Sequence, residues 1–435
     1  MASKDSHNNK PLIGFLPCFY SIGETIPVVK MAQEYIKMGG SAIFFSHGGK
    51  YEYLAEELGC DIIRLNNIWD GSKDSEEEFF KRGGKLHELV NTLYTPDNID
   101  ACATDEIDAF RKTGIRMIVC SFNLSASISA PVVGIPVVAV VSGVATPPYY
   151  ERWATFPDTF DNLFFRIFPS SLKDRFAKWF LVRTKLGVRA FNKVATKYGV
   201  EKFKTYNDIY CGDHTLVGDD MDYLQVAPSE QIPKENFIGP IIYGEPYKFN
   251  PDRVDKDILE HIKRPGRTIV IAMGSTGDKK MFLDIVNAMN GTRYNVIIVY
   301  SNVLKENELP KVNENILFKN FIALTDVTKM TDLAITHGGR GTTYTVAYSG
   351  KPAVCIPMFF EHQYNIQILQ RYGSAIMLSK TRFSTKKMLM SIENIFQNYE
   401  TYLNNAKKVE KKLPKYGCEK NGAERLVELV QEPKR

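Results

Sequence analysis

The residues whose types and spacing best suit chemistry lie in segment 335–365, which reads ITHGGRGTTYTVAYSGKPAVCIPMFFEHQYN. An apolar strand is expected to enter a His-Gly-Gly turn at His337, with a helix starting near Thr342. Glycines let the backbone approach a ligand closely, and a helix start offers unpaired N–H groups and partial positive charge that suit a diphosphate. A second strand, 353–357, leads to Glu361, whose carboxylate can accept hydrogen bonds from two adjacent sugar hydroxyls. The alternative is a plain strand-to-helix turn whose helix end holds no ligand.

Strand and helix signals alternate in both halves of the chain and would position these residues. Apolar strands are expected at 11–17, 41–46, 61–65, 115–120 and 135–141, and again at 268–273, 295–300, 316–318, 333–336 and 353–357. Repeated β-α-β units with continuously apolar strands predict an α/β fold of doubly wound parallel sheets covered on both faces. Such sheets bind ligands beyond the carboxyl ends of their strands, so two facing sheets would suit a two-substrate enzyme.

The length of 435 residues is more than one hydrophobic core usually supports, so two domains are expected. We expect an N-terminal domain at 1–240, a C-terminal domain at 241–410, and a final helix within 411–435 that packs on either domain, with the N-terminal one as a candidate. The hinge is expected in 236–251, which is rich in Gly and Pro.

Composition narrows the class of protein. No run of 18 apolar residues predicts a membrane-spanning helix, and the start lacks the basic-then-apolar order of a secretory signal, so a cytoplasmic location is expected. The seven cysteines are odd in number and widely spaced without a CxxC, which predicts reduced, mostly buried thiols. A dehydrogenase is disfavoured because no GxGxxG follows the first strand.

Positive charge is concentrated in the window 161–204, where eleven Lys or Arg face three Asp or Glu, although the whole chain carries only +5. Aromatic residues interleave with these bases, which suits an anionic membrane surface or a hydrophobic acceptor. Nucleic acid is disfavoured because no recognised module accompanies the pattern. The alternative is an ordinary amphipathic helix with its aromatics in the core. The candidate acceptor-side residues are Phe164, Phe168, Phe176 and Trp179.

Segment 335–365 resembles the donor-binding signature of family 1 glycosyltransferases, whose bacterial and sterol-type members read HGGxGT, then Gly-x-Pro, then Pro-x-x-x-acid. The matching positions are His337, Gly338, Gly339, Gly341, Thr342, Gly350, Pro352, Pro357, Glu361 and Asn365. Further family motifs resemble 134–136 (GIP), 238–240 (IGP) and 422–425 (GAER), so the resemblance covers nearly the whole chain. It implies the GT-B fold, in which two Rossmann-like domains face each other across a cleft, with the acceptor on the N-terminal domain and the nucleotide sugar on the C-terminal one.

The resemblance also implies roles for single residues. His337 would hydrogen-bond the diphosphate, the loop AMGSTG after strand 268–273 would touch phosphate, and Phe321 would stack on the base. The alternative for Phe321 is a core aromatic. The implied donor-binding set is Gly274, Ser275, Thr276, Phe321, His337, Gly338, Gly339, Gly341, Thr342, Glu361, His362 and Gln363.

The sequence departs from the family at the general base, because 23–27 read GETIP where many members have a Gly-His pair. Glu24 holds the place of that His, and sterol- and glycopeptide-type members carry an Asp there. A carboxylate base needs a raised pKa, which partial burial in a cleft would supply. The alternative is that Glu24 only stabilises the positive start of a helix. The family's partner Asp is missing after strand 115–120, which is coherent because a carboxylate has no tautomer to fix.

Two departures concern the donor. His362 replaces the Gln that usually follows the sugar-binding acid, with Gln363 one residue further on, so glucose, galactose and other hexoses stay open. Residues 323–324 (Ala-Leu) replace the Pro-Gln after the base-stacking aromatic, which weakens the case for uracil, although UDP is the expected nucleotide.

These features predict an inverting hexosyltransferase that uses a UDP-sugar, a hydroxyl of a hydrophobic or lipid-like acceptor, and Glu24 as general base. No cofactor and no metal are expected, because the helix start and glycine N–H groups can stabilise the leaving diphosphate. One alternative is a sugar-nucleotide epimerase on the same fold, and another is a non-catalytic protein that binds a nucleotide sugar or lipid. Peripheral membrane contact through 161–204 extends the cytoplasmic expectation.

Overall fold

The computed structural model describes residues 11–66, 95–274, 277–301 and 303–432. They form two compact units, of which unit 1 comprises Met1–Arg152, Lys178–Tyr243 and Gly417–Arg435. Unit 2 comprises Trp153–Ala177 and Gly244–Tyr416. Segment 153–177 therefore packs with unit 2, although it lies inside the range expected for the N-terminal domain.

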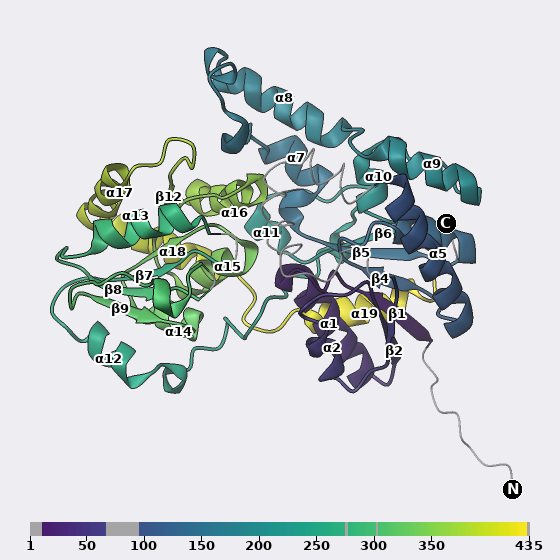
Figure 1. Ribbon diagram of the computed structural model, residues 1–435, viewed down its shortest axis with the longest axis horizontal. Helices are drawn as coiled ribbons and strands as arrows, with labels where there is room; N and C mark the ends of the chain where they lie inside the picture. Colours follow the sequence, from purple (N-terminus) through teal and green to yellow (C-terminus); the bar gives the residue numbers. More distant parts are fainter. Residues whose placement is uncertain (1–10, 67–94, 275–276, 302, 433–435) are drawn as a thin grey trace, which may run out of the picture. The chain divides into compact units, whose positions relative to one another are not determined.

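Unit 1 is built on a six-stranded parallel sheet with the order β3-β2-β1-β4-β5-β6 (Figure 1). Its strands are β1 (Leu12–Leu16), β2 (Ser41–Ser46), β3 (Ile62–Arg64), β4 (Ile118–Cys120), β5 (Val137–Val141) and β6 (His214–Val217). Its helices are α1 (Ile22–Lys37), α2 (Tyr53–Glu56), α5 (Pro96–Thr113), α6 (Ala126–Val133), α7 (Pro147–Trp153), α9 (Val188–Tyr198), α10 (Tyr206–Tyr210), α11 (Met221–Leu224) and α19 (Glu419–Leu429). Helix α8 (Ser170–Arg183) runs from unit 2 into unit 1.

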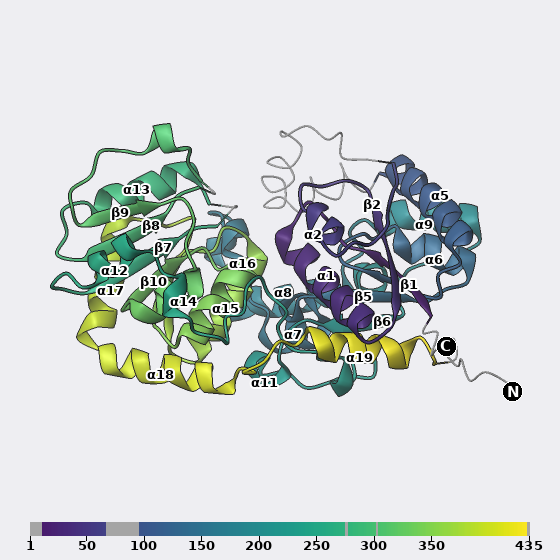
Figure 2. The same ribbon diagram turned by 90° about the horizontal axis from the view of Figure 1, so that it is seen from below.

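Alternate residues of the unit 1 strands pack on opposite faces of the sheet, as a buried parallel sheet requires. Phe44 of β2 joins the core under α1 and α19, whereas its neighbour Phe45 joins the core under α5 and α6. Figure 2 shows the final helix α19 side by side with α1. The final helix therefore packs on unit 1.

Helix α1 begins at Ile22 after the N-cap Ser21 and contains Pro27. The hydroxyl of Thr25 donates to the carbonyl oxygens of Ser21 and Cys18 at 2.8 and 3.0 Å, which fixes the first turn to the loop after β1. This start places Glu24 in the first turn of α1.

Unit 2 repeats the architecture with the strand order β12-β11-β10-β7-β8-β9, again all parallel (Figure 1). Its strands are β7 (Thr268–Ala272), β8 (Asn295–Val299), β9 (Ile316–Lys319), β10 (Leu333–Thr336), β11 (Ala353–Cys355) and β12 (Ala375–Met377). Its helices are α12 (Lys256–Ile262), α13 (Lys279–Met289), α14 (Leu324–Met330), α15 (Arg340–Ser349), α16 (Phe360–Arg371), α17 (Thr385–Gln397) and α18 (Tyr399–Lys412). The predicted class, α/β with two Rossmann-like parallel sheets, is confirmed.

Candidate donor site

The His-Gly-Gly turn connects the central strand β10 to helix α15. Gly338 adopts φ +85°, and Gly339 is the N-cap of α15, which begins at Arg340 rather than near Thr342. The hydroxyls of Thr342 and Thr343 both donate to the carbonyl oxygen of Gly339 at 2.9 Å. These hydroxyls bond to a carbonyl oxygen rather than to the backbone N–H groups of the first turn, and N–H groups at a helix start suit an anion.

The ring of His337 is enclosed by two glycines. A Cβ atom on Gly274 would lie 2.3 Å from its Cε1 atom, and one on Gly339 would lie 2.5 Å from its Nε2 atom. Gly274 also has φ +61°, a conformation that L side chains rarely adopt. Any larger residue at either position would displace the imidazole, so both glycines are required by the position of the ring.

His337 is neutral and carries an unsatisfied polar atom. Burial lowers the pKa of His337 to about 4, against a smaller opposing effect of the Ala272 backbone. The side chain is 6% exposed, and its Nδ1 atom has no hydrogen-bond partner among the described residues. A buried polar atom without a partner costs free energy, which a bound ligand can recover. The imidazole is therefore prepared for a hydrogen bond that none of the described residues supplies.

Helix α16 supports the turn from behind. The side-chain amide of Asn365 donates to the carbonyl oxygen of Gly338 at 3.2 Å, and a Cβ atom on Gly338 would meet Ile366 at 2.4 Å. Glu361 is half-buried and lies in the first turn of α16, the helix that follows β11. The turn and the predicted sugar-binding acid are thus held together within one unit.

His362 lies beneath His337. Its ring is 4.7 Å from the ring of His337 at an interplanar angle of 80°, and 3.7 Å from the ring of Phe359. Its Nδ1 atom accepts from the backbone N–H of Met358 at 3.4 Å. Burial, followed by the nearby His337 and Lys380, lowers the pKa of His362 well below 6.5. A neutral, buried His362 supports the ring of His337 rather than presenting a free charge.

Gln363 is engaged by the segment that unit 2 takes from the N-terminal half. Its Oε1 atom accepts from the backbone N–H of Asp158 at 2.8 Å, and its Nε2 atom donates to Thr155 Oγ1 at 2.8 Å and to the Phe156 carbonyl at 3.1 Å. Ser379 donates to the Asp158 carboxylate at 2.6 Å. This clamp, the set of hydrogen bonds between Gln363 and residues 155–158, was not predicted by any local sequence pattern, because its two sides are more than 200 residues apart in the chain.

The remaining predicted donor residues lie in different surroundings. Phe321, after β9, is 70% exposed, so the alternative of a core aromatic is wrong. A Cβ atom on Gly341 would meet nothing within 4 Å. Ser275 and Thr276 lie outside the described residues.

Glu24 lies in unit 1, beyond the carboxyl end of β1. Its carbonyl oxygen accepts from the hydroxyl of Ser121 at 2.7 Å, and Asn123 Nδ2 donates to the Leu16 carbonyl at 2.9 Å. Residues 121–123, where the family's partner Asp is missing, therefore fix the end of β1 and the first turn of α1, which carries Glu24. Burial, followed by the negative charge of Glu24, raises the pKa of Cys18 to about 12.

The four acceptor-side aromatics are all exposed, so the alternative that places them in the core is wrong. They are Phe164, Phe168, Phe176 and Trp179. The seven cysteines are free, and five of them are buried, as expected for reduced thiols.

A buried polar cluster in unit 1 was not singled out in the sequence. His47 Nε2 lies 2.9 Å from Glu106 Oε1, and the hydroxyls of Ser125 and Ser129 also donate to the Glu106 carboxylate. Burial opposes a charge on His47, but its hydrogen bonds with Cys102 and Glu106 raise its pKa to about 11. The arrangement is an internal ion pair that joins the end of β2 to α5 and α6.

Two Asp-x-Asp triplets, at 220–222 and 255–257, are engaged in local structure. Asp220 accepts from the backbone N–H of Tyr223 as the N-cap of α11, and Asp255 and Asp257 both pair with Lys319. Within the described ranges, no group of three His, Cys, Asp or Glu side chains could hold a metal ion. No helix in the same ranges has the length and apolar character needed to cross a membrane.

Comparison with known proteins shows what this part of the chain resembles. The glycosyltransferase family 28 C-terminal domain matches residues 268–428, which contain the His-Gly-Gly turn and Glu361. A solved structure of the glycotransferase of kitacinnamycin matches 98% of this chain and 100% of its own length with a TM-score of 0.69 at 14% identity. The chain has the GT-B fold, and its residues 268–428 match this family model. Another GT-B structure, VinC in complex with dTDP, covers 97% of this chain and 98% of its own with a TM-score of 0.62 at 14% identity.

The curated relatives of this chain are distant in sequence. The PGL/p-HBAD biosynthesis glycosyltransferase of Mycobacterium tuberculosis is 23% identical over 285 residues, 64% of this chain and 62% of that protein. The uncharacterized UDP-glucosyltransferase YojK of Bacillus subtilis is 23% identical over 226 residues, 51% of this chain and 53% of its own. The chain thus spans less than two thirds of the length of these relatives.

Proposed function

We propose that the protein transfers a hexose from a nucleotide sugar, with UDP as the expected nucleotide, to a hydroxyl of a hydrophobic or lipid-like acceptor. The observation that carries this proposal is the neutral, buried ring of His337 in the turn that leads into α15, together with its Nδ1 atom, which has no hydrogen-bond partner among the described residues. A diphosphate at that helix start would receive the N–H groups of the first turn and a hydrogen bond from the imidazole. The YojK relative bears the name of a UDP-glucosyltransferase, and VinC was solved with dTDP, so both pyrimidine nucleotides belong in the test.

In the proposed mechanism Glu24 is the general base. Its carboxylate takes the proton of the acceptor hydroxyl as the oxygen attacks the anomeric carbon from the side opposite the nucleotide. The new C–O bond forms while the bond from the anomeric carbon to the diphosphate oxygen breaks, so the configuration inverts. The negative charge of the departing diphosphate grows next to the positive end of α15, where preorganised donors stabilise it without reorganisation. Neither metal nor cofactor takes part in these steps.

Glu361 would hold hydroxyls of the transferred sugar, since a carboxylate accepts two hydrogen bonds. Its neighbour His362 would act indirectly, by holding the ring of His337 in place. The centroids of the two rings are 4.7 Å apart. The side-chain amide of Gln363 is already hydrogen-bonded to Thr155, Phe156 and Asp158, so a hydrogen bond from Gln363 to the sugar would compete with the clamp. The acceptor class is supported by the exposed aromatics of 164–179.

The test measures binding and turnover with UDP-glucose, UDP-galactose, UDP-N-acetylglucosamine and a dTDP-sugar. Thermal shift reports binding, and release of free nucleotide reports transfer or slow hydrolysis. We expect one donor to stabilise the wild type and Glu24→Gln equally, while Glu24→Gln loses nucleotide release by about 10²-fold or more. The matched control is Glu34→Gln on the same helix, which removes only a surface pair with Lys37.

Other outcomes would indicate a different function for this protein or refute the proposed one. Conversion of one UDP-hexose into another without nucleotide release would indicate an epimerase. Tight donor binding with no turnover on any acceptor would indicate a binding protein. No stabilisation by any nucleotide sugar or nucleotide would refute the proposed function.

A further inference from the structure

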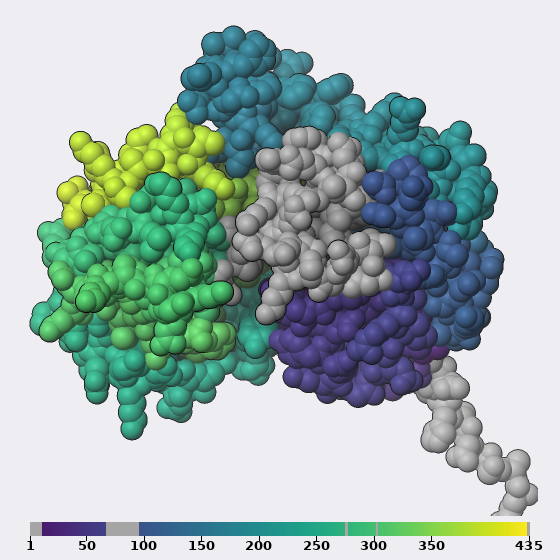
Figure 3. Space-filling view, in the orientation of Figure 1, coloured from purple at the N-terminus to yellow at the C-terminus, as the bar shows by residue number. Residues whose placement is uncertain are grey.

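The stretch 160–183 carries its apolar side chains on the outside. Leu163 is 80% exposed and Ile167 is 73% exposed, in and beside the 3-10 helix at Phe165–Ile167. On α8, Leu172, Phe176 and Trp179 follow one another at intervals of four and three residues, so they lie on one side of the helix. In Figure 3 this teal segment forms part of the visible surface.

The opposite side of α8 makes the internal contacts. Ala177 is the buried residue of this helix, and the carboxylate of Asp174 accepts from the backbone N–H of Phe156 at 2.8 Å. Lys173 donates to Asp161 at 2.7 Å. A surface helix normally turns its apolar side inward and its charges outward, so α8 is reversed. Several large apolar side chains exposed on neighbouring segments of the chain mark a site of interaction.

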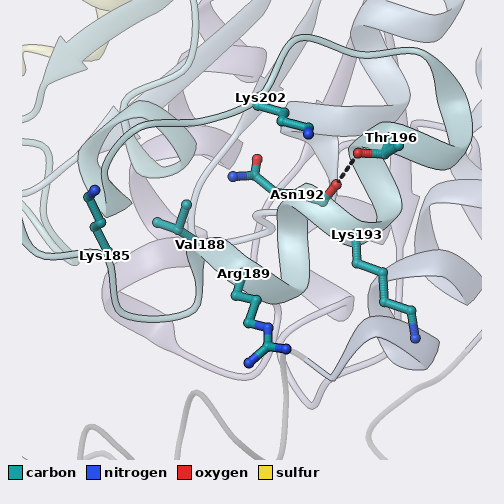
Figure 4. A pocket seen from close by; sticks show the side chains of 7 residues that line it. All are labelled: Lys185, Val188, Arg189, Asn192, Lys193, Thr196 and Lys202. Carbon is teal, nitrogen blue, oxygen red and sulfur yellow. Dashed lines mark hydrogen bonds between the residues drawn. The ribbon is translucent and has the colours of Figure 1, made fainter.

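Along 161–200 the charge that is not engaged in internal contacts is positive. Between 161 and 200 the only acids are Asp161 and Asp174, and both make the internal contacts just described. Exposed Arg175 and Arg183 remain on α8. The positive charge continues along the chain into α9, where a concavity of about 490 Å³ is lined by Lys185, Val188, Arg189, Asn192, Lys193, Thr196 and Lys202 (Figure 4).

We propose that the exposed side of 163–180 docks on an anionic lipid bilayer. Phe and Trp side chains suit the boundary between headgroups and acyl chains, and Arg side chains beside them suit anionic headgroups. A second copy of this chain is the less suitable occupant, because its matching surface would bring positive charge against positive charge. The inference deepens the proposed function, because an enzyme docked on the bilayer meets a lipid-like acceptor there. Docking itself does not depend on the proposed function, and only the role of this acceptor rests on it.

The test uses the full chain and vesicles of phosphatidylcholine with or without phosphatidylglycerol, at low and high salt. We expect binding that requires phosphatidylglycerol and weakens with salt, as screening predicts. The variant Leu163→Glu/Ile167→Glu should lower the partition coefficient at least about tenfold. Arg175→Glu/Arg183→Glu should remove most of the dependence on phosphatidylglycerol. Met390→Glu is the matched control, because Met390 is 61% exposed on α17, away from this segment in the chain.

Three results would overturn the proposal. One is the absence of vesicle binding at low salt, and another is an equal effect of Met390→Glu and Leu163→Glu/Ile167→Glu. The third is a wild-type dimer in sedimentation that Leu163→Glu/Ile167→Glu converts to monomer. Thermal stabilisation by UDP, measured on the same samples, shows separately whether the proposed function holds, and unchanged melting temperatures show that the variants fold.

Discussion

The replacement Gly274→Ala tests whether donor binding depends on the enclosure of His337. The new Cβ atom would lie 2.3 Å from Cε1 of the ring, whereas ordinary contact begins at 3.4 Å, so the ring or the loop must move by about 1 Å. The φ of +61° adds strain of about 1 kcal/mol for a residue other than glycine. A displacement of about 1 Å in a positioning group costs about a hundredfold in rate, so we expect kcat/KM to fall by about that factor.

The assay pairs calorimetric titration with UDP and steady-state nucleotide release. Gly199→Ala is the matched control, because Gly199 also has a positive φ of +71° but a Cβ atom there would meet nothing within 4 Å. In the double variant with His337→Ala, the ring that clashes is absent, so Gly274→Ala should add little further loss. Wild-type affinity and turnover in Gly274→Ala, or a double variant much worse than His337→Ala alone, would refute the reasoning.

Three further predictions concern the same unit. Burial lowers the pKa of His337 from 6.5 to about 4, so the contribution of the neutral ring to stability is complete above pH 6.5 and is lost as the pH falls toward 4. Over that range, denaturant titrations should show the free energy of unfolding of the wild type falling by up to about 3 kcal/mol relative to that of His337→Gln. Gln363→Ala should lower the free energy of unfolding by about 2–3 kcal/mol through three lost hydrogen bonds, whereas Gln370→Ala on the exposed side of α16 should not; equal stability of the two variants would contradict the clamp. Phe321→Ala should weaken UDP about tenfold in calorimetry and Phe321→Tyr should not, and equal affinities would exclude base stacking.

The sequence predicted the central strands well because they are continuous apolar runs. The expected strands at 295–300 and 333–336 are observed as β8 and β10 within one residue. Two strands were missed, β6 and β12, and both lie at an edge of their sheet. They have four and three residues, so neither forms a run long enough to stand out from the surrounding loops.

Motif spacing predicted which residues gather at the His-Gly-Gly turn, but not how each is used. Glu361 and His362 are neighbours in the chain, yet the helix turns them about 100° apart, which leaves Glu361 half-buried and sends His362 under His337. The partners of Gln363 come from a segment more than 200 residues earlier, and no local pattern reports such a pairing. Pairings of this kind depend on tertiary packing, which a single sequence does not display.

The assignment of 153–177 to unit 2 affects how the protein can be divided. The chain passes from one unit to the other four times, after residues 152, 177, 243 and 416. A fragment that begins at 244 would lack the strip 153–177, which hydrogen-bonds the side-chain amide of Gln363 and the hydroxyl of Tyr364. The Tyr364 hydroxyl donates to the carbonyl oxygen of Thr155 at 2.9 Å. Chimeras that exchange halves at one linker would pair this strip with a foreign α16. Exchange of acceptor modules between relatives should therefore transfer 153–177 together with the C-terminal half.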